Sequence, residues 1–177
     1  MVSLSQIELL LPELRAFAQA IGDTRDDAED LVQDAIERAL RAADPPGKLS
    51  ELRPWLFRVI RNLHYDELRK RRVRREYLAD AIRQSDIAAP QAETERDVLL
   101  RRAFDRLPAE RREILFLVDV LGLKYSETAE VLGLAPGTVM SRLSRARRAL
   151  LALIDGDEAP QDETPATGKS AEHARSE

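Results

Sequence analysis

The sequence predicts an all-α protein made of two small helical domains joined by a flexible linker. Its composition is typical of helices, since only 7 of 177 residues are Gly and 5% are aromatic. Apolar residues recur every three or four positions in several segments, and no segment alternates with the period of a strand. Residues 79–93 have weak periodicity and contain Pro90. We predict domains at residues 1–78 and 96–154, a linker at 79–95 and a disordered acidic tail at 155–177.

Two helices are expected before residue 43. The first begins near Pro12, which suits a first helical position because proline lacks an N–H, and it ends at Gly22. Residues 3–10 are expected to form a short separate helix. The second helix begins at Asp26 or Asp27, where a side-chain oxygen can cap the chain and acids suit the helix dipole.

The third helix follows a loop at residues 43–51, where Pro45-Pro46-Gly47 interrupts the helical pattern. It is expected to begin at Pro54 and to run to about Arg75. The second domain shows the same periodicity, broken by prolines and glycines. Helices are predicted over residues 97–107, 108–121, 127–132 and 136–154.

The composition also excludes several classes of protein. With no Cys and two His, disulfides and Cys-based sites are impossible, and little remains for zinc or His-based catalysis. No apolar run is long enough to span a membrane, and no secretion signal begins the chain, so we expect a cytoplasmic protein without membrane insertion. We expect no cofactor and no metal.

The net charge of −4 combines segments of opposite sign. Residues 155–177 hold seven acids and two bases, and residues 23–37 hold seven acids and one base. Residues 53–76 instead hold nine bases and three acids, and residues 136–154 hold four Arg and no acid. An overall acidic charge therefore does not argue against nucleic-acid binding.

Residues 125–151 have the pattern of a helix-turn-helix, with Gly133 in the turn. Apolar residues line one face of the last helix, and the other face is polar and basic. Arginines on such a helix can read guanine in the major groove, although an ordinary solvated face is the alternative. The lack of acids favours DNA. The predicted DNA-contacting residues are Thr138, Ser141, Arg142, Arg145 and Arg148.

The third helix presents a second basic surface, in which Arg is interleaved with Asn and Tyr. Arg and Lys can pair with phosphates, while Asn and Tyr can read or stack on unpaired bases. A solvated charge patch is about as consistent with the run from Arg69 to Arg75 alone. The candidate residues are Arg58, Arg61, Asn62, Tyr65, Asp66, Arg69 and Lys70.

The segments DLVQDAIERAL and PWLFRVIRNLHYDELRKRR resemble region 2 of bacterial sigma factors, and LPAERREILFLVDVLGLKYSETAEVLGLAPGTVMSRLSRARRAL resembles their region 4. The short segment between them is similar to the extracytoplasmic-function (ECF) group, and NLHYDELRKRR and GTVMSRLSRAR are similar to its alphaproteobacterial general-stress-response subgroup. The resemblance implies that Asp30, Gln33 and Asp34 dock on core RNA polymerase. It also implies that the third helix melts and reads the −10 element of promoter DNA, that the last helix reads the −35 element, and that an anti-sigma factor is a partner.

Other classes of function remain open at this point. A sigma mimic would bind an anti-sigma factor without touching DNA, but the basic residues count against it. A free-standing helix-turn-helix regulator would leave the acidic helix without a role. An enzyme is the third class, but the acids cluster on helix faces without an accompanying nucleophile or metal set.

Overall fold

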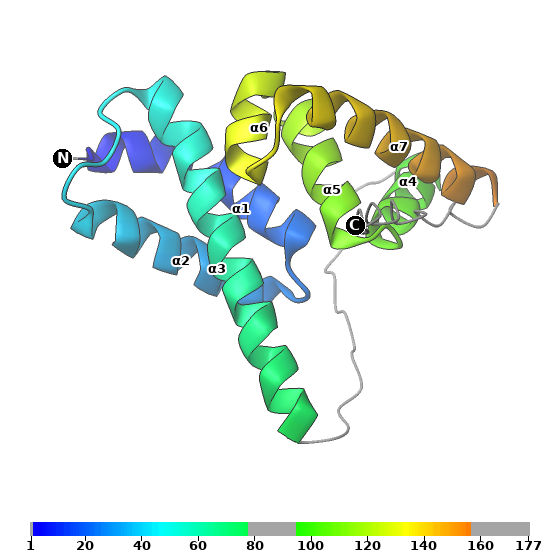
Figure 1. The fold of residues 1–177 in the computed structure, drawn as a ribbon, viewed down its shortest axis with the longest axis horizontal. Coiled ribbons are helices and arrows are strands. Elements are labelled where there is room, and N and C mark those ends of the chain that lie inside the picture. The colour runs from blue at the N-terminus through cyan, green and yellow to red at the C-terminus, as the bar shows by residue number, and fades with distance from the viewer. Residues whose placement is uncertain (1, 78–94, 157–177) are drawn as a thin grey trace, which may run out of the picture.

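The computed structural model describes residues 2–77 and 95–156, which are entirely helical apart from turns and caps and contain no strand (Figure 1). The elements in chain order are α1 (Leu4–Ile21), α2 (Arg25–Arg41), α3 (Leu49–Tyr77), α4 (Glu95–Asp105), α5 (Ala109–Leu115), the short π-helix η1 (Phe116–Val120), α6 (Tyr125–Leu132) and α7 (Pro136–Asp155). The predicted all-α class is therefore confirmed. Of the predicted linker, only Glu95 is described, as the first residue of α4. Of the predicted tail, only Asp155 and Gly156 are described.

Helices α1, α2 and α3 pack against one another as the first unit. Phe17 and Phe57 are fully buried, and their rings meet edge to face with centroids 5.2 Å apart. The predicted break at Pro12 was wrong, because α1 runs through this proline as one helix. Ile7 and Leu10 are buried on the same side as Leu14, and burial of this continuous stripe outweighs the hydrogen bond that the proline removes.

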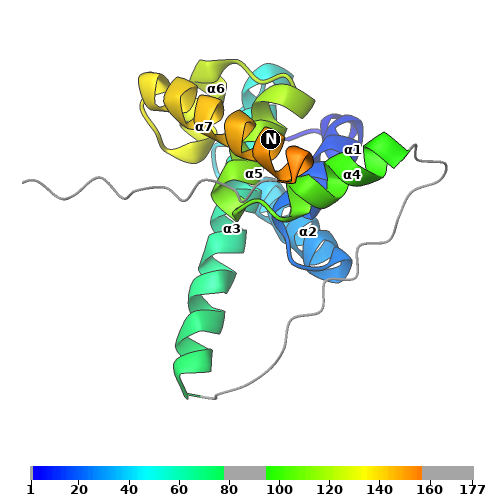
Figure 2. The ribbon, with the colours of Figure 1, turned by 90° about the vertical axis from the view of Figure 1, so that its right-hand side faces the viewer.

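The starts of α2 and α3 also differ from the prediction. Thr24 caps α2, and its hydroxyl accepts a hydrogen bond of 3.1 Å from the amide of Asp27. Helix α3 begins at Leu49, five residues before Pro54, and this first turn buries Leu52 completely. The last turns of α3 extend beyond the other helices in both views (Figures 1 and 2).

The second unit contains α4 to α7. Instead of one α-helix ending at Leu121, the chain turns into η1, where the amide of Leu121 donates to the carbonyl of Phe116, 2.9 Å away. Gly133, with φ of 65°, makes the left-handed turn between α6 and α7. Helix α7 spans nearly the residues that the sequence predicts.

The two units share an interface in this structure. Helix α3 lies along α6, and α1 lies along α5 (Figures 1 and 2). Phe17 of the first unit and Phe116 of the second have ring centroids 6.3 Å apart. Arg53 on α3 donates to the carbonyl of Leu121, 2.6 Å away, and also pairs with Glu13 at 2.6 Å. The interface therefore combines apolar packing with directed polar contacts.

Candidate functional site

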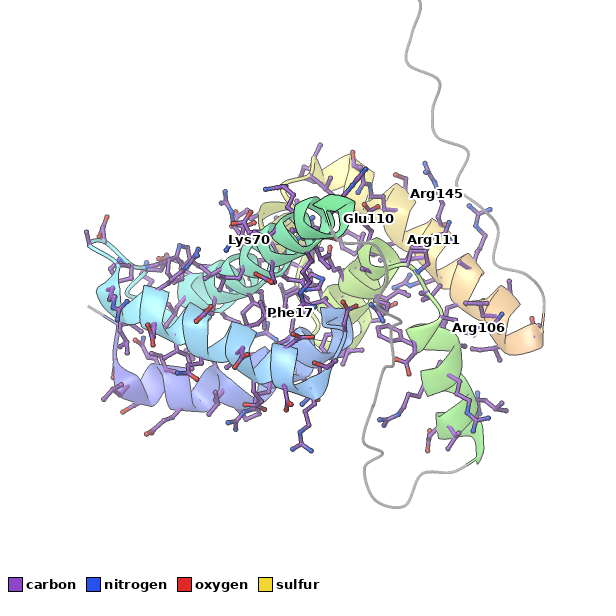
Figure 3. The ribbon with its side chains drawn as sticks, turned by 90° about the horizontal axis from the view of Figure 1, so that it is seen from below. Phe17, Lys70, Arg106, Glu110, Arg111 and Arg145 are labelled. Atoms are coloured by element: carbon purple, nitrogen blue, oxygen red, sulfur yellow. The ribbon has the colours of Figure 1, made fainter. Side chains whose placement is uncertain are left out.

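The inner and outer faces of α7 differ sharply in character. Val139, Leu143 and Ala146 are at most 2% exposed and pack against the rest of the second unit. The outer face carries the residues that the sequence predicts as DNA contacts: Thr138 is half-buried, and Ser141, Arg142, Arg145 and Arg148 are exposed. Arg145 points away from the body of the molecule (Figure 3). This arrangement leaves the second helix of the helix-turn-helix open for a ligand.

The arginines of α7 fall into two groups. Arg147 holds Asp119 of η1 through two hydrogen bonds, one of which joins Nε to Oδ2 over 3.0 Å. Arg142, Arg145 and Arg148 form no ion pair within the described ranges 2–77 and 95–156. Three cations on one helix face are thus left for an anionic partner.

Five of the predicted residues of α3 form an exposed row along one side of the helix. Arg58, Asn62, Asp66, Arg69 and Lys70 are exposed. Asp66 pairs with Arg69 at 2.9 Å on the helix surface, which partly neutralises that arginine. The row therefore presents cations and an amide along one side of α3.

Two other predicted residues of α3, Arg61 and Tyr65, are turned towards the second unit. Arg61 Nε donates to Glu113 Oε2 of α5 over 3.2 Å, and its guanidinium lies 4.6 Å from the centre of the Tyr65 ring. Glu113 is 1% exposed. The Tyr65 hydroxyl and Glu113 Oε1 are both buried, and neither makes a hydrogen bond within the described part of the chain. The structure thus brings these two candidates to a carboxylate rather than to solvent.

The electrostatics of this contact reflect its burial. Loss of water raises the pKa of the Glu113 carboxyl above its usual range, and the Arg61 guanidinium opposes that rise. Burial, followed by the charge of Glu113, raises the pKa of the Tyr65 hydroxyl well above its usual range. The hydroxyl therefore stays protonated, and it remains a donor if Glu113 moves away.

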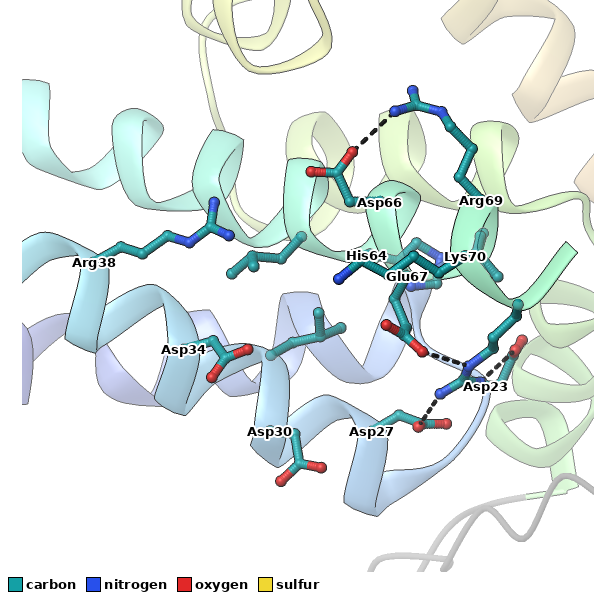
Figure 4. A pocket seen from close by; sticks show the side chains of 14 residues that line it. Asp23, Asp27, Asp30, Asp34, Arg38, His64, Asp66, Glu67, Arg69 and Lys70 are labelled. Atoms are coloured by element: carbon teal, nitrogen blue, oxygen red, sulfur yellow. Dashed lines mark hydrogen bonds and ion pairs between the residues drawn. The ribbon is translucent and has the colours of Figure 1, made fainter. Parts of the chain in front are cut away.

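The predicted docking residues lie on the outer side of α2. Asp30, Gln33 and Asp34 are all exposed, and none forms an ion pair or side-chain hydrogen bond with another described residue. Asp30 and Asp34 also line a groove of about 540 Å³ between α2 and α3 (Figure 4). Two carboxylates and an amide are thereby offered on one helix face.

Arg71 fixes one end of this groove, and the sequence did not single it out. It donates to Asp27 over 2.6 Å and pairs with Glu67 at 3.3 Å and Asp23 at 3.7 Å (Figure 4). Its hydrogen bond holds the pKa of the Asp27 carboxyl below the usual value. Nearby His64 is buried, and burial lowers the pKa of its ring. These contacts hold the second half of α3 against the start of α2.

Glu113 was also missed, although the sequence carries a signal for it. Glu113 stands four residues before buried Leu117, so it falls on the apolar face of its helix, where an acid is unusual. For Arg53, no such feature of the sequence pattern indicates its contact with the second unit. Among the described residues no group of three or more His, Cys, Asp or Glu is placed to hold a metal ion, and no helix is long and apolar enough to cross a membrane.

Comparison with known proteins identifies these two units. Residues 6–74 match Sigma-70 region 2, and residues 97–150 match Sigma-70, region 4. The chain is 40% identical over 152 residues to the ECF RNA polymerase sigma factor EcfG of Rhodopseudomonas palustris, covering 84% of this chain and 83% of EcfG. This chain belongs to the ECF sigma factors. It is an alternative sigma factor, which directs promoter recognition and transcription initiation.

Two solved sigma-factor structures have a similar fold. One is the sigma factor RpoE in complex with the anti-sigma factor NepR from Bartonella quintana, with a TM-score of 0.75, 34% identity, and coverage of 87% of this chain and 97% of that one. The other is CnrH in complex with the cytosolic domain of CnrY, with a TM-score of 0.57, 30% identity, and coverage of 87% and 90%. The order of the two regions in this sigma factor agrees with the order that the sequence predicts.

Proposed function

We propose that this sigma factor uses three separate surfaces for its three tasks. The outer side of α2 docks on core RNA polymerase, the row along α3 melts and reads the −10 element, and the outer face of α7 reads the −35 element. The observation that carries the assignment is the outer face of α7, where three exposed arginines have no acidic partner among the described residues.

The −35 assignment follows from the geometry of a recognition helix. The first turns of such a helix meet base edges in the major groove, and later turns approach phosphates. Thr138, Ser141 and Arg142 stand in the first two turns of α7, so they are the base-reading candidates. Arg145 and Arg148 follow, and they fit a further base and the backbone, respectively.

The −10 assignment requires both a basic row and groups that can read unpaired bases. Arg58, Arg69 and Lys70 supply positive charge along α3, and Asn62 supplies an exposed amide. Arg61 and Tyr65 complete the set only when Glu113 releases them. Stacking and amide contacts favour melted DNA because a duplex does not offer its base faces.

The docking assignment rests on charge and exposure. Asp30, Gln33 and Asp34 are spaced three and four residues apart, so they present one acidic patch to a basic partner. Compensation of the helix dipole would explain acids near the start of α2, but Asp34 lies beyond the first turn. An acidic patch left without partners within the described ranges is what a docking surface requires.

The relatives support further parts of the proposal. The known structure of RpoE with the anti-sigma factor NepR supports an anti-sigma factor as a partner of this chain. The resemblance of its sequence motifs to the general-stress-response subgroup supports a role in that response. We assign the protein no catalytic activity and no cofactor, and we place it in the cytoplasm with core polymerase and DNA. Residues 1–78 and 96–154 are the proposed functional domains.

The test is in vitro transcription with core RNA polymerase on a promoter library. The full chain is expected to select promoters with two conserved elements, and Arg145→Ala is expected to weaken selection at the −35 element only, by about tenfold at one base pair. The double variant Asp30→Asn with Asp34→Asn is expected to weaken polymerase binding, whereas the exposed loop variant Asp44→Asn is not. Polymerase binding without transcription would support a mimic, and DNA binding without polymerase would support a free-standing regulator.

A further inference from the structure

One apolar side chain stands among the polar residues at the start of α7. Met140 is 59% exposed, although Val139 before it is fully buried. The residues at spacings of three or four from it are Pro136, Gly137, Leu143 and Ser144, of which Leu143 is buried and the other three are exposed. Gly137 and Ser144 are small, which agrees with the high exposure of the Met140 side chain.

Exposure alone does not distinguish Met140, because single exposed apolar side chains are common on protein surfaces. Leu151, near the other end of α7, is also 59% exposed. What distinguishes Met140 is its position along the helix, because it lies in the same first two turns of α7 as Thr138, Ser141 and Arg142, the candidates for base reading. Leu151 lies eleven residues later, about 16 Å along the helix axis.

The polar residues near Met140 are not suited to recognise an apolar group on DNA, whereas a methionine is. The Ser141 hydroxyl donates to the Thr138 carbonyl over 3.0 Å, so its proton is used within the helix. The arginines can read guanine through its two acceptors, but they gain nothing from a methyl group. Thymine differs from the other bases in the major groove by its 5-methyl group, which is read by apolar contact. A flexible, polarisable thioether is well suited to that contact.

We propose that Met140 is a specificity-determining residue, which contacts the 5-methyl group of a thymine in the −35 element. This inference rests on the proposed role of α7. T·A and A·T place this methyl group on opposite sides of the major groove, so the contact selects thymine on one strand at one position of the element. The contact with DNA is favoured over one with protein because Met140 lies in the part of α7 that holds the base-reading candidates, and Arg142, Arg145 and Arg148 of the same helix have no acidic partner among the described residues.

The experiment uses the full chain with core RNA polymerase on its library-selected promoter. Each thymine of the −35 element, on either strand, is replaced in turn by deoxyuridine, which lacks only the methyl group. Promoter binding of the wild type is expected to weaken three- to fivefold at one thymine, the effect of one buried methyl group. Met140→Ala is expected to bind the thymine and deoxyuridine promoters equally well, and Met140→Leu to keep part of the discrimination.

Leu151→Ala is the matched control, because it removes an equally exposed apolar side chain from the same helix. It is expected to keep the full preference for thymine. Circular dichroism and polymerase binding verify that each variant is folded. The proposal is overturned if the wild type ignores every methyl group, if Met140→Ala still discriminates, or if Met140→Ala weakens only the binding of an anti-sigma factor. Absence of any promoter selection would instead defeat the proposed function itself.

Discussion

The ion pair between Arg61 and Glu113 is expected to contribute measurably to the contact between the two units. Their side chains are 24% and 2% exposed, and the pair closes at 3.2 Å. At that separation an effective dielectric constant of about 20 gives a gross attraction of roughly 5 kcal/mol. Loss of hydration offsets most of it, so we expect a net coupling of about 1–3 kcal/mol.

A double-mutant cycle of Arg61→Gln and Glu113→Gln measures this coupling. Arg61→Gln is expected to cost the most, about 2–4 kcal/mol, because it leaves a buried carboxylate without its partner. Glu113→Gln is expected to cost about 1 kcal/mol, because the amide oxygen still accepts from Arg61. Urea unfolding at pH 7, followed by circular dichroism and by the fluorescence of Trp55, the sole tryptophan, gives the four free energies.

A matched pair within the first unit serves as the control. Arg15 and Glu29 lie at a similar distance, 3.1 Å, but their side chains are 49% and 41% exposed. Exposed pairs are typically worth about 0.2–1 kcal/mol. A coupling for Arg61 and Glu113 no larger than that of the control would refute the reasoning. At pH 4 the coupling is expected to shrink, because the pKa of Glu113 is raised and its carboxyl is then neutral.

Three further measurements test the local structure. Gly133→Ala is expected to destabilise the chain by about 1 kcal/mol because φ is +65° there, whereas Gly47→Ala, in open space, is expected to be neutral in thermal unfolding. The hydrogen bond with Arg71 is the main cause of the lowered pKa of Asp27, so the charged carboxylate stabilises the folded state above about pH 3.8. This stabilisation is lost as the pH falls through the lowered pKa, and urea unfolding of Asp27→Asn is expected not to show the loss. Burial lowers the pKa of His64, so the folded state keeps this ring neutral at pH values where the unfolded state already binds a proton. Stability is therefore full above about pH 6.5 and decreases as the pH falls further, and His64→Gln is expected to flatten that part of the plot of stability against pH.

Helix faces were predictable because they depend on local periodicity. The alternation of buried Val139 and Leu143 with exposed Ser141 and Arg142 follows from 3.6 residues per turn, and it is the same in any helix that packs one face. The exposure of Asp30 followed in the same way. These residues keep their neighbours whatever the arrangement of the two units.

The features that the sequence did not predict depend on partners far along the chain. Arg61 has the same helical position whether it faces solvent or Glu113, which lies 52 residues away. The continuous α1 is a similar case, since local rules place a helix start at Pro12 and only the burial of Ile7 and Leu10 overrides them. The π-turn at Phe116 likewise has no local periodicity that would reveal it.

The compact arrangement also bears on how both promoter elements can be read. The −35 and −10 elements, which the proposed function assigns to α7 and α3, differ in nominal position by about 25 base pairs, or roughly 85 Å at about 3.4 Å per pair. A packed body of this size has a radius of gyration of only about 14 Å. Residues 78–94 can extend over at most roughly 60 Å, so the sequence between α3 and α4 is long enough for the units to move apart. Under the proposed function, binding to a promoter therefore breaks the contacts of Arg61 and Arg53 with the second unit. The free energy lost with the Arg61–Glu113 pair must then be offset by contacts with polymerase and DNA.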